Sequence, residues 1–285
     1  MKQRISFAGK LFGCFLPLFA GYGCQLLISF VGMFVYTMVV TAKGVAEGIS
    51  EAELFVFIET QLLNPDFLMT VTAIATASTL LLGIIWYRKH RPVRDASFKE
   101  VSNGTLFLSL ALMGVSLQCL ISMCLNIIYP LLPQVLIEEY DALMETLLGG
   151  SVWLSLFVTV ILAPLAEELL FRGVTMRKAE KIMPFMAANI LQAILFGIYH
   201  GNLIQGTYAF AMGLILGFVV EYFHSIWASI LLHAFVNGSA ELLSHLPQQL
   251  TETMLGIVAI AIVGVMFLLI AVKLFPKAKK KIITK

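Results

Sequence analysis

The chain has 285 residues and a formal net charge of +2, and 59% of its residues are hydrophobic while only 13% are charged. A soluble domain carries roughly 25% charged residues, a disordered chain is far less hydrophobic, and a nucleic-acid binder needs a strongly basic face, so these three classes are excluded. With a mean hydropathy of +0.91, the composition predicts an all-α, polytopic membrane protein that contacts lipid and has no nucleic-acid partner.

A helix needs about 20 apolar residues to cross a bilayer, and about eight such stretches occur along the chain. The first begins near the N-terminus but has no clear cleavage site, so we expect a retained span rather than a signal peptide. Two connecting loops, 43–65 and 131–150, are amphipathic enough to hold short interfacial helices. The predicted spans are residues 11–41, 66–87, 104–129, 151–170, 185–201, 205–223, 225–243 and 252–274.

The charges in the loops alternate in sign. All but one of the 19 Lys and Arg residues fall in four places: the N-terminus, the 88–99 loop, the segment after the fourth span and the C-terminal tail. The intervening loops, near 47–66 and 138–145, are acidic. Because Lys and Arg stay on the cytoplasmic side of a membrane, this pattern predicts eight spans with both termini cytoplasmic.

A first polar cluster lies where the fourth predicted span ends, and it contains Glu167, Glu168 and Arg172. Helical spacing places Glu168 and Arg172 one turn apart on the same side, so that Arg172 would hold Glu168 charged. Glu167 is rotated by about 100° from Glu168 and lacks this partner, which leaves it free to act as a base or a metal ligand. The plainer interpretation is a helix end whose charges reach the interface.

Two further clusters lie in apolar segments: His200 at the end of the fifth span, and His233 with Asn237 one turn apart in the seventh. Taken singly, a histidine bonded to a carbonyl, or polar residues that join two helices by hydrogen bonds, would explain them. Three polar clusters in neighbouring segments of the same chain favour a chemical role instead, because ionised groups are costly in a bilayer.

Two hydrolytic chemistries fit these residues. Glu167, His200 and His233 are of the types that bind a divalent metal such as zinc in hydrolases. Alternatively, a glutamate and a histidine polarise water without metal, while a histidine and an asparagine stabilise an oxyanion. One difficulty is geometric: if the fourth and fifth spans both crossed fully and straight, His200 would lie far from Glu167. One of the two segments must therefore be tilted, short or displaced.

The three clusters resemble the motifs of a known family. Glu167-Glu168-x-x-x-Arg172-Gly173, Phe196-x-x-x-His200 and His233-x-x-x-Asn237 are similar, in order and spacing, to those of the CPBP family. These are the CAAX proteases and bacteriocin-processing membrane proteins, also called the Abi family. The resemblance covers about residues 145–245 and implies an intramembrane protease, often described as a metalloprotease.

The resemblance also implies roles for the residues. Glu167 and His200 would activate the hydrolytic water, and His233 and Asn237 would stabilise the oxyanion. Glu168 and Arg172 would orient the site. The same resemblance divides the chain into N-terminal spans with amphipathic loops, a catalytic core, and a last span with a basic tail. The boundaries of these parts are 1–144, 145–245 and 246–285.

The expected activity is the cleavage of a peptide bond in a membrane-associated protein or peptide, in a bacterial plasma membrane. A basic cytoplasmic face and small size resemble bacterial members and argue against a prenylated substrate. One alternative is a bacteriocin-immunity or regulatory protein that uses the same scaffold without catalysis. Another is a transporter with a proton relay, although transporters usually show repeats in both halves and here the polar residues lie in one half.

Overall fold

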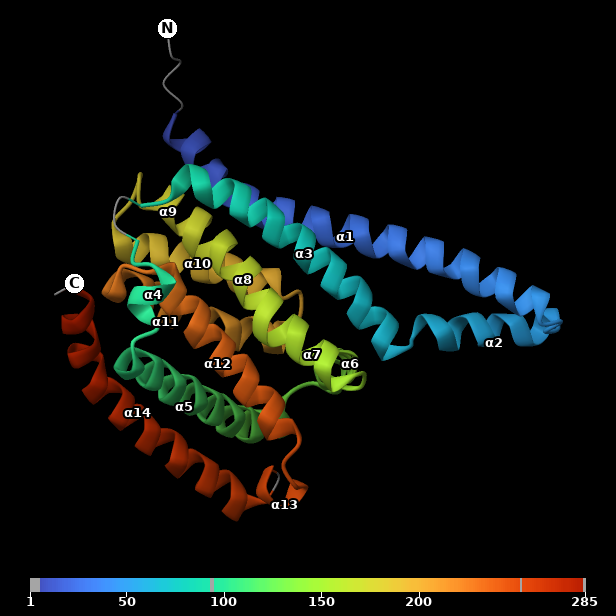
Figure 1. The fold of residues 1–285 in the computed structure, drawn as a ribbon. Coiled ribbons are helices and arrows are strands. Elements are labelled where there is room, and N and C mark those ends of the chain that lie inside the picture. Colours follow the sequence, from blue (N-terminus) through green and yellow to red (C-terminus); the bar gives the residue numbers. More distant parts are fainter. Residues whose placement is uncertain (1–5, 93–94, 252, 284–285) are drawn as a thin grey trace, which may run out of the picture.

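The structure, a computed structural model, describes residues 6–92, 95–251 and 253–283, and its regular elements in this part of the chain are all helices (Figure 1). Seven of the described helices are long and apolar enough to cross a membrane. The prediction of an all-α, polytopic membrane protein is therefore confirmed. These seven are Phe7–Ala46, Pro65–His90, Gly104–Leu131, Val152–Ala179, Leu203–Phe223, Ile226–Ser244 and Met254–Lys279.

The elements follow one another with short connections. The N-terminal half contains α1 (Phe7–Ala46), α2 (Glu51–Leu62), α3 (Pro65–His90), α4 (Phe98–Val101), α5 (Gly104–Ile128), the 3₁₀ turn η1 (Tyr129–Leu131) and α6 (Gln134–Leu148). One continuous span then runs through α7 (Val152–Leu156), η2 (Phe157–Leu162), α8 (Ala163–Glu168), η3 (Leu169–Met176) and α9 (Arg177–Ala179). The last elements are α10 (Phe185–Tyr199), α11 (Leu203–Phe223), α12 (Ile226–Ser244), α13 (Gln248–Thr251) and α14 (Met254–Ile283).

The N-terminal helices form an arm that extends beyond the rest of the bundle (Figure 1). α1 is 40 residues long and most of its apolar side chains are exposed, as expected for a helix that faces lipid. Ser6 caps its first turn by accepting from the Gly9 backbone N–H, and Asn64 caps α3 in the same way at Phe67. The short helices α2 and α6 lie in the two loops where the sequence predicted them.

The fourth and fifth predicted spans differ from their expected lengths. The fourth continues without a break to Ala179, so Glu167 lies inside it rather than at its end. The fifth is only the 15-residue helix α10, which is too short to count among the seven spans. At 1.5 Å per residue, Glu167 lies ~18 Å along the helix from Ala179, and α10 is ~22 Å long. Glu167 and His200 therefore reach a similar depth, which removes the geometric difficulty.

The turn after α10 sets the position of His200. Gly201 has a φ of +67°, a conformation that suits glycine, and its N–H donates to the Ile198 carbonyl to end the helix. α10 and α11 then pack as a tight antiparallel pair, since a Cβ built on Gly206 would lie 2.7 Å from the Gly197 carbonyl oxygen. His200 therefore lies at the turn that joins these two helices.

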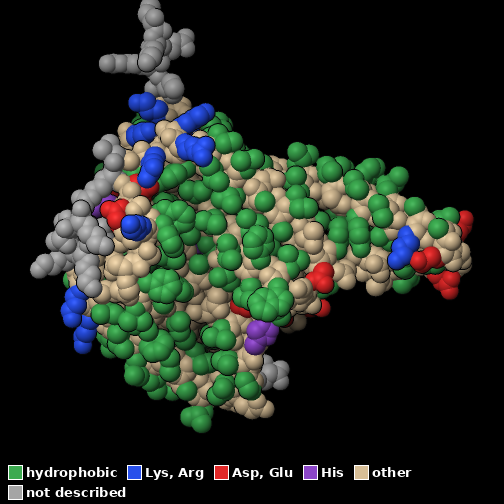
Figure 2. Space-filling view, viewed as in Figure 1, with side chains coloured by type: hydrophobic (Ala, Val, Ile, Leu, Met, Phe, Trp, Pro, Cys, Tyr) green, Lys and Arg blue, Asp and Glu red, His purple; other side chains and the backbone are tan. Residues whose placement is uncertain are grey.

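Lys and Arg side chains gather at one end of the molecule, on the left in Figure 2. α1 begins and α14 ends at this end (Figure 1). Lys178 donates to the Gly13 carbonyl at 3.0 Å, and Lys279 lies 4.1 Å from the centre of the Tyr222 ring. The side of the membrane on which this basic end lies stays a prediction. Six of the basic residues used for it lie outside the described residues or side chains: Lys2, Arg4, Arg94, Lys280, Lys281 and Lys285.

The predicted orientation can be checked with C-terminal fusions. If the basic end is cytoplasmic, a green fluorescent protein fused after Lys285 should fluoresce, and alkaline phosphatase fused there should be inactive because it needs an oxidising compartment. A second pair of fusions within the acidic loop after Glu47 should give the opposite result. An active phosphatase at the C-terminus would contradict the predicted orientation.

The close packing of α10 against α11 predicts a position-specific effect of added volume. Gly206→Ala should lower stability by about 1–3 kcal/mol, because overpacking forces the two backbones apart. Gly23→Ala is the matched control, since a Cβ there meets nothing within 4 Å. Thermal unfolding of both purified variants in detergent measures the difference, and equal melting temperatures would contradict this packing.

Candidate active site

A fully buried ion pair lies at the centre of the site. The Arg172 Nη1 group donates to Glu168 Oε1 at 2.7 Å, and both side chains are 0% exposed. The pair joins successive turns of one helix, which is the i,i+4 arrangement expected from the sequence. Burial of two charges is costly unless each is compensated, so this pair constrains every element that touches it.

His233, from α12, lies between the two neighbouring glutamates. Its Nδ1 lies 2.9 Å from Glu168 Oε1, while its Nε2 lies 3.7 Å from Glu167 Oε2. A carboxylate accepts only, so the short contact places a proton on Nδ1. The imidazole is thereby oriented by Glu168, and its other nitrogen faces Glu167.

Glu167 and His200 line the same cavity. Glu167 has no contact with the buried Arg172 comparable to that of Glu168, and its side chain stays 15% exposed. The His200 Nδ1 group lies 2.9 Å from the Phe196 carbonyl oxygen, to which it donates. The Nε2 of a neutral His200 is then a free acceptor, which is the state that a general base requires.

The Phe196 ring is packed between the charged and the imidazole groups. Its centre lies 4.1 Å from the Arg172 guanidinium carbon, 4.8 Å from the His200 ring centre and 5.8 Å from the His233 ring centre. A cation over an aromatic face is stabilised by the ring quadrupole. The motif spacing placed Phe196 on the same face as His200, but only the packing shows that this ring also touches the other two groups.

Asn237 is held by a carbonyl that a proline leaves free. Its Nδ2 donates to the Thr159 carbonyl oxygen at 2.8 Å. Thr159 lies in η2, a π-helical turn, where a carbonyl would accept from the residue five positions on; that residue is Pro164, which has no N–H. The second N–H of the Asn237 amide remains for another acceptor. The sequence analysis missed Thr159, although a proline in a span is the signal for a freed carbonyl.

A contact from α1 supports the end of α10. The Tyr22 hydroxyl donates to the Ile198 carbonyl, two residues before His200. The Tyr22 ring also packs against Tyr199, with their centres 5.3 Å apart. No motif marks Tyr22, because its role depends on how α1 packs against α10.

The cavity has a volume of about 750 Å³ and reaches from the site to α6. The exposed Glu138, Glu139, Asp141 and Glu145 of this helix define what we call the acidic end of the molecule. At mid-depth it is lined by Glu167, His200, His233 and Asn237, and at the acidic end by α6 and the turn before α13. The N-terminal spans also contribute polar groups to its wall. These are Gln25 of α1, Thr72 and Thr76 of α3, and Gln118, Ser122 and Asn126 of α5.

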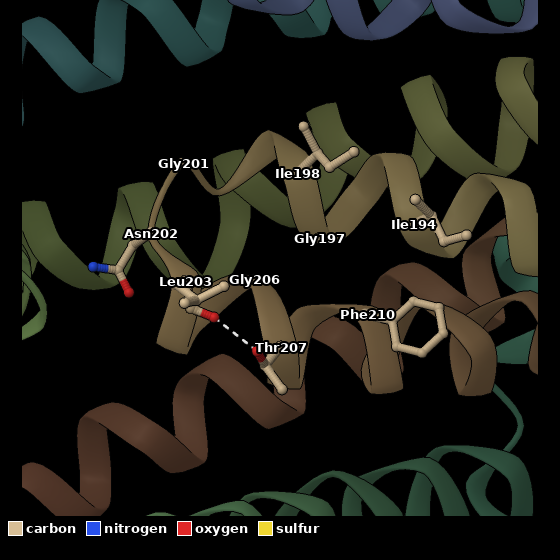
Figure 3. Close-up of a pocket in the computed structure, with 9 residues that line it drawn as sticks. All are labelled: Ile194, Gly197, Ile198, Gly201, Asn202, Leu203, Gly206, Thr207 and Phe210. Atoms are coloured by element: carbon tan, nitrogen blue, oxygen red, sulfur yellow. Dashed lines mark hydrogen bonds between the residues drawn. The ribbon is translucent and has the colours of Figure 1, made fainter. Parts of the chain in front are cut away.

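A second hollow, of about 580 Å³, lies over the α10–α11 pair (Figure 3). None of its lining residues lines the larger cavity. Its polar side chains already have partners within the chain, since Thr207 donates to the Leu203 carbonyl and Asn202 caps α11 at Gln205. It contains no titratable side chain, so we assign it no chemistry.

The predicted metal ligands do not form a metal-binding group. Across the described residues, no set of three or more His, Cys, Asp and Glu side chains is arranged to hold a metal ion. Glu167, His200 and His233 supply donor types that zinc accepts, and histidines whose Nδ1 groups donate to a carbonyl or a carboxylate keep Nε2 for a metal, so it is the spacing of the three side chains that does not suit an ion. The arrangement does not fit a three-ligand site, and we derive no step through a metal.

Comparison with known proteins agrees with the motifs. Residues 149–239 match the family described as type II CAAX prenyl endopeptidase, Rce1-like. YdiL of Bacillus subtilis (strain 168), provisionally named a membrane peptidase, is 27% identical over 137 residues, which are 46% of this chain and 53% of YdiL. The chain thus spans about half the length of the curated relative that it matches. No solved structure matches the chain significantly.

The resemblance predicted from the three motifs is therefore confirmed, and the matched segment contains every predicted site residue from Glu167 to Asn237. The matched family is described as an endopeptidase, and the relative is named as a membrane peptidase. The seven candidate spans agree with a location in a membrane.

The buried ion pair predicts a large cost for removing one partner. Arg172→Ala should destabilise the protein by about 3–5 kcal/mol, because it leaves the buried Glu168 carboxylate without its cationic partner. Lys43→Ala, which breaks an exposed i,i+4 pair with Glu47 at 3.8 Å, should cost at most about 1 kcal/mol. Thermal unfolding in detergent measures both.

The double variant Glu168→Gln/Arg172→Gln tests whether the unpaired charge causes the instability of Arg172→Ala, because it removes both charges together. It should recover part of the stability lost in Arg172→Ala. If it is as unstable as the single variant, the loss comes from packing rather than from the unpaired charge.

Proposed function

We propose that the protein is an intramembrane endopeptidase that hydrolyses a peptide bond in a membrane-associated protein or peptide. The observation that carries this proposal is the single cavity that Glu167, His200, His233 and Asn237 all line. The match of residues 149–239 to an endopeptidase family supports it. Hydrolysis at this depth needs water, and a cavity of about 750 Å³ has room for both water and an extended peptide.

In the proposed reaction, Glu167 and the free Nε2 of His200 take a proton from water as it attacks the carbonyl carbon. The oxyanion that forms accepts hydrogen bonds from His233 and from the second N–H of Asn237. This requires a proton on His233 Nε2, since its Nδ1 donates to Glu168. When the carbon–nitrogen bond breaks, the proton held by Glu167 and His200 passes to the leaving amine.

Glu168 and Arg172 act through other residues in this proposal. Neither is exposed to the cavity, as both are fully buried. Glu168 orients the His233 ring, and Arg172 keeps Glu168 charged and lies against Phe196. They are therefore positioning residues rather than groups that touch the substrate.

In the proposed division of the chain, the N-terminal spans bind the substrate together with the catalytic core. We take residues 145–245 as the catalytic core, residues 1–144 as N-terminal spans and residues 246–285 as the last span and basic tail. Gln118, Ser122 and Asn126 lie at i, i+4 and i+8 on α5 and line the cavity. The N-terminal spans would thus provide hydrogen-bonding groups for an extended peptide backbone.

A comparison of peptide profiles tests the activity. Membranes and medium from cells that express wild type should contain a peptide that is absent with Glu167→Ala and with His200→Ala, while its precursor accumulates. Glu221→Gln is the matched control, because Glu221 is 43% exposed and lies near Arg177 at the basic end. Equal amounts of each variant in the membrane must be verified.

Normal cleavage by both Glu167→Ala and His200→Ala would contradict the mechanism. Identical profiles for all variants, together with a resistance phenotype that survives Glu167→Ala and His233→Ala, would favour the alternative of a bacteriocin-immunity or regulatory protein.

A further inference from the structure

The cavity that contains the proposed site is lined by carboxylates but, among its described residues, by no lysine or arginine. The carboxylates are Glu167 and Glu241. Glu241 is not part of the three motifs and lies near the acidic end of the cavity, on the same helix as His233 and Asn237. A carboxylate in a membrane span is costly and is a candidate for function.

Glu241 continues a line of polar residues along α12. His233, Asn237 and Glu241 follow one another at i, i+4 and i+8, so they share one face of the helix. All three line the cavity. With 1.5 Å per residue, Glu241 lies about 12 Å from His233 along the helix axis. A substrate bound at His233 and Asn237 would therefore pass this carboxylate if it continues toward the acidic end.

Glu241 is buried but poorly compensated. Its side chain is only 5% exposed, and its described ion-pair partner is His245, which lies 3.4 Å away and is 52% exposed. Ser155 Oγ lies 3.1 Å from Glu241 Oε2, but also 2.8 Å from the Leu147 carbonyl oxygen. A hydroxyl has one proton and can donate to only one of them. No permanent cation of the described chain neutralises this carboxylate.

The surroundings of the cavity mouth have the same sign of charge. α6 lines the acidic end of the cavity and presents four exposed acidic residues to solvent: Glu138, Glu139, Asp141 and Glu145. A surface of one sign attracts ligands of the opposite sign, and low-dielectric walls strengthen this attraction. The mouth therefore favours a cationic ligand before it reaches Glu241.

We propose that Glu241 is an anionic subsite that binds the ammonium or guanidinium group of a Lys or Arg in the substrate. This inference rests on the proposed endopeptidase function and names the class of its substrate, a cationic peptide. An extended chain advances about 3.3 Å per residue, and Glu241 lies about 12 Å from His233. The basic residue should therefore lie three or four positions from the scissile bond.

Ser155 and His245 fit this role as neighbours. The substrate cation would donate to the Glu241 carboxylate in the cavity, while Ser155 keeps its bond to Leu147. His245 would remain at the half-exposed edge of the subsite. A charge-assisted hydrogen bond in a cavity with low-dielectric walls is worth more than one at a surface, so a single carboxylate can decide which peptide is accepted.

A positional scan of peptides tests the proposal. Wild type in proteoliposomes is given a series of 14-residue peptides in which Lys, Gln or Glu occupies each position in turn, and cleavage and binding are both measured. Binding is measured with fluorescent peptides on Glu167→Ala, so that it does not depend on cleavage. Lys three or four positions from the cut should raise kcat/KM and affinity by about tenfold or more over Gln.

Variants at position 241 test whether the Glu241 carboxylate causes the preference for Lys peptides. Glu241→Gln should abolish the preference for Lys, and Glu241→Arg should prefer the Glu peptides instead. Glu59→Gln is the matched control: it removes an exposed acidic charge on α2, which does not line the cavity, and should keep the preference. Because the wild-type series needs no variant, instability of Glu241→Gln does not prevent the test.

The possible outcomes distinguish a failure of the Glu241 subsite from a failure of the endopeptidase proposal. Equal use of Lys and Gln peptides by wild type, or a Lys preference that survives in Glu241→Gln, overturns the subsite and leaves the endopeptidase proposal intact. Lys-dependent binding that Glu241→Gln abolishes, with no cleavage by wild type, keeps the subsite and overturns the endopeptidase. Absence of both binding and cleavage for every Lys peptide overturns the subsite.

Discussion

The polar site depends on one constraint, which is that Glu168 and Arg172 are both charged in a place that water does not reach. Two such charges are tolerated only when their partners are in contact and correctly aligned. Glu168 accepts from Arg172 and from His233, and Arg172 also lies over the Phe196 ring. These contacts link three segments, the central span, α10 and α12, and they position the residues that line the cavity.

Helix length is the second determinant of the site. A full span on α10 would carry His200 to the opposite side of the bundle from Glu167. Instead Gly201 ends α10 after 15 residues, and the central span continues past Glu167 to Ala179. Two antiparallel segments of unequal length thus bring a glutamate and a histidine to the same depth. The irregular turn before Pro164 adds a carbonyl that orients Asn237.

Positive and negative side chains gather at different ends of the molecule. Lys and Arg gather at the end where α1 begins (Figure 2), whereas the cavity leads away from that end toward the acidic helix α6. A peptide that enters through this mouth meets carboxylates first and the proposed catalytic groups last. The polar residues of α5 line the same path, so the spans outside the matched segment belong to the cavity as much as the motifs do.

The sequence determined what depends on local spacing. Composition and hydropathy predicted a helical membrane protein, and the i,i+4 rule predicted the contact between Glu168 and Arg172, because residues one turn apart meet in any α-helix. The motifs also marked His200, His233 and Asn237 as candidates, and those roles stay proposals. The alternating loop charges agree with the basic end seen in the structure.

Only the tertiary structure decided what depends on packing between distant segments. It placed His233 between two glutamates, extended the fourth span beyond the predicted residue 170, and brought Tyr22 and Thr159 to the site. It also showed that Glu167, His200 and His233 are not arranged as a metal-binding group in the described part of the chain. Such contacts join residues far apart in the chain, and the periodicity of a single helix carries no information about which neighbour its face will meet.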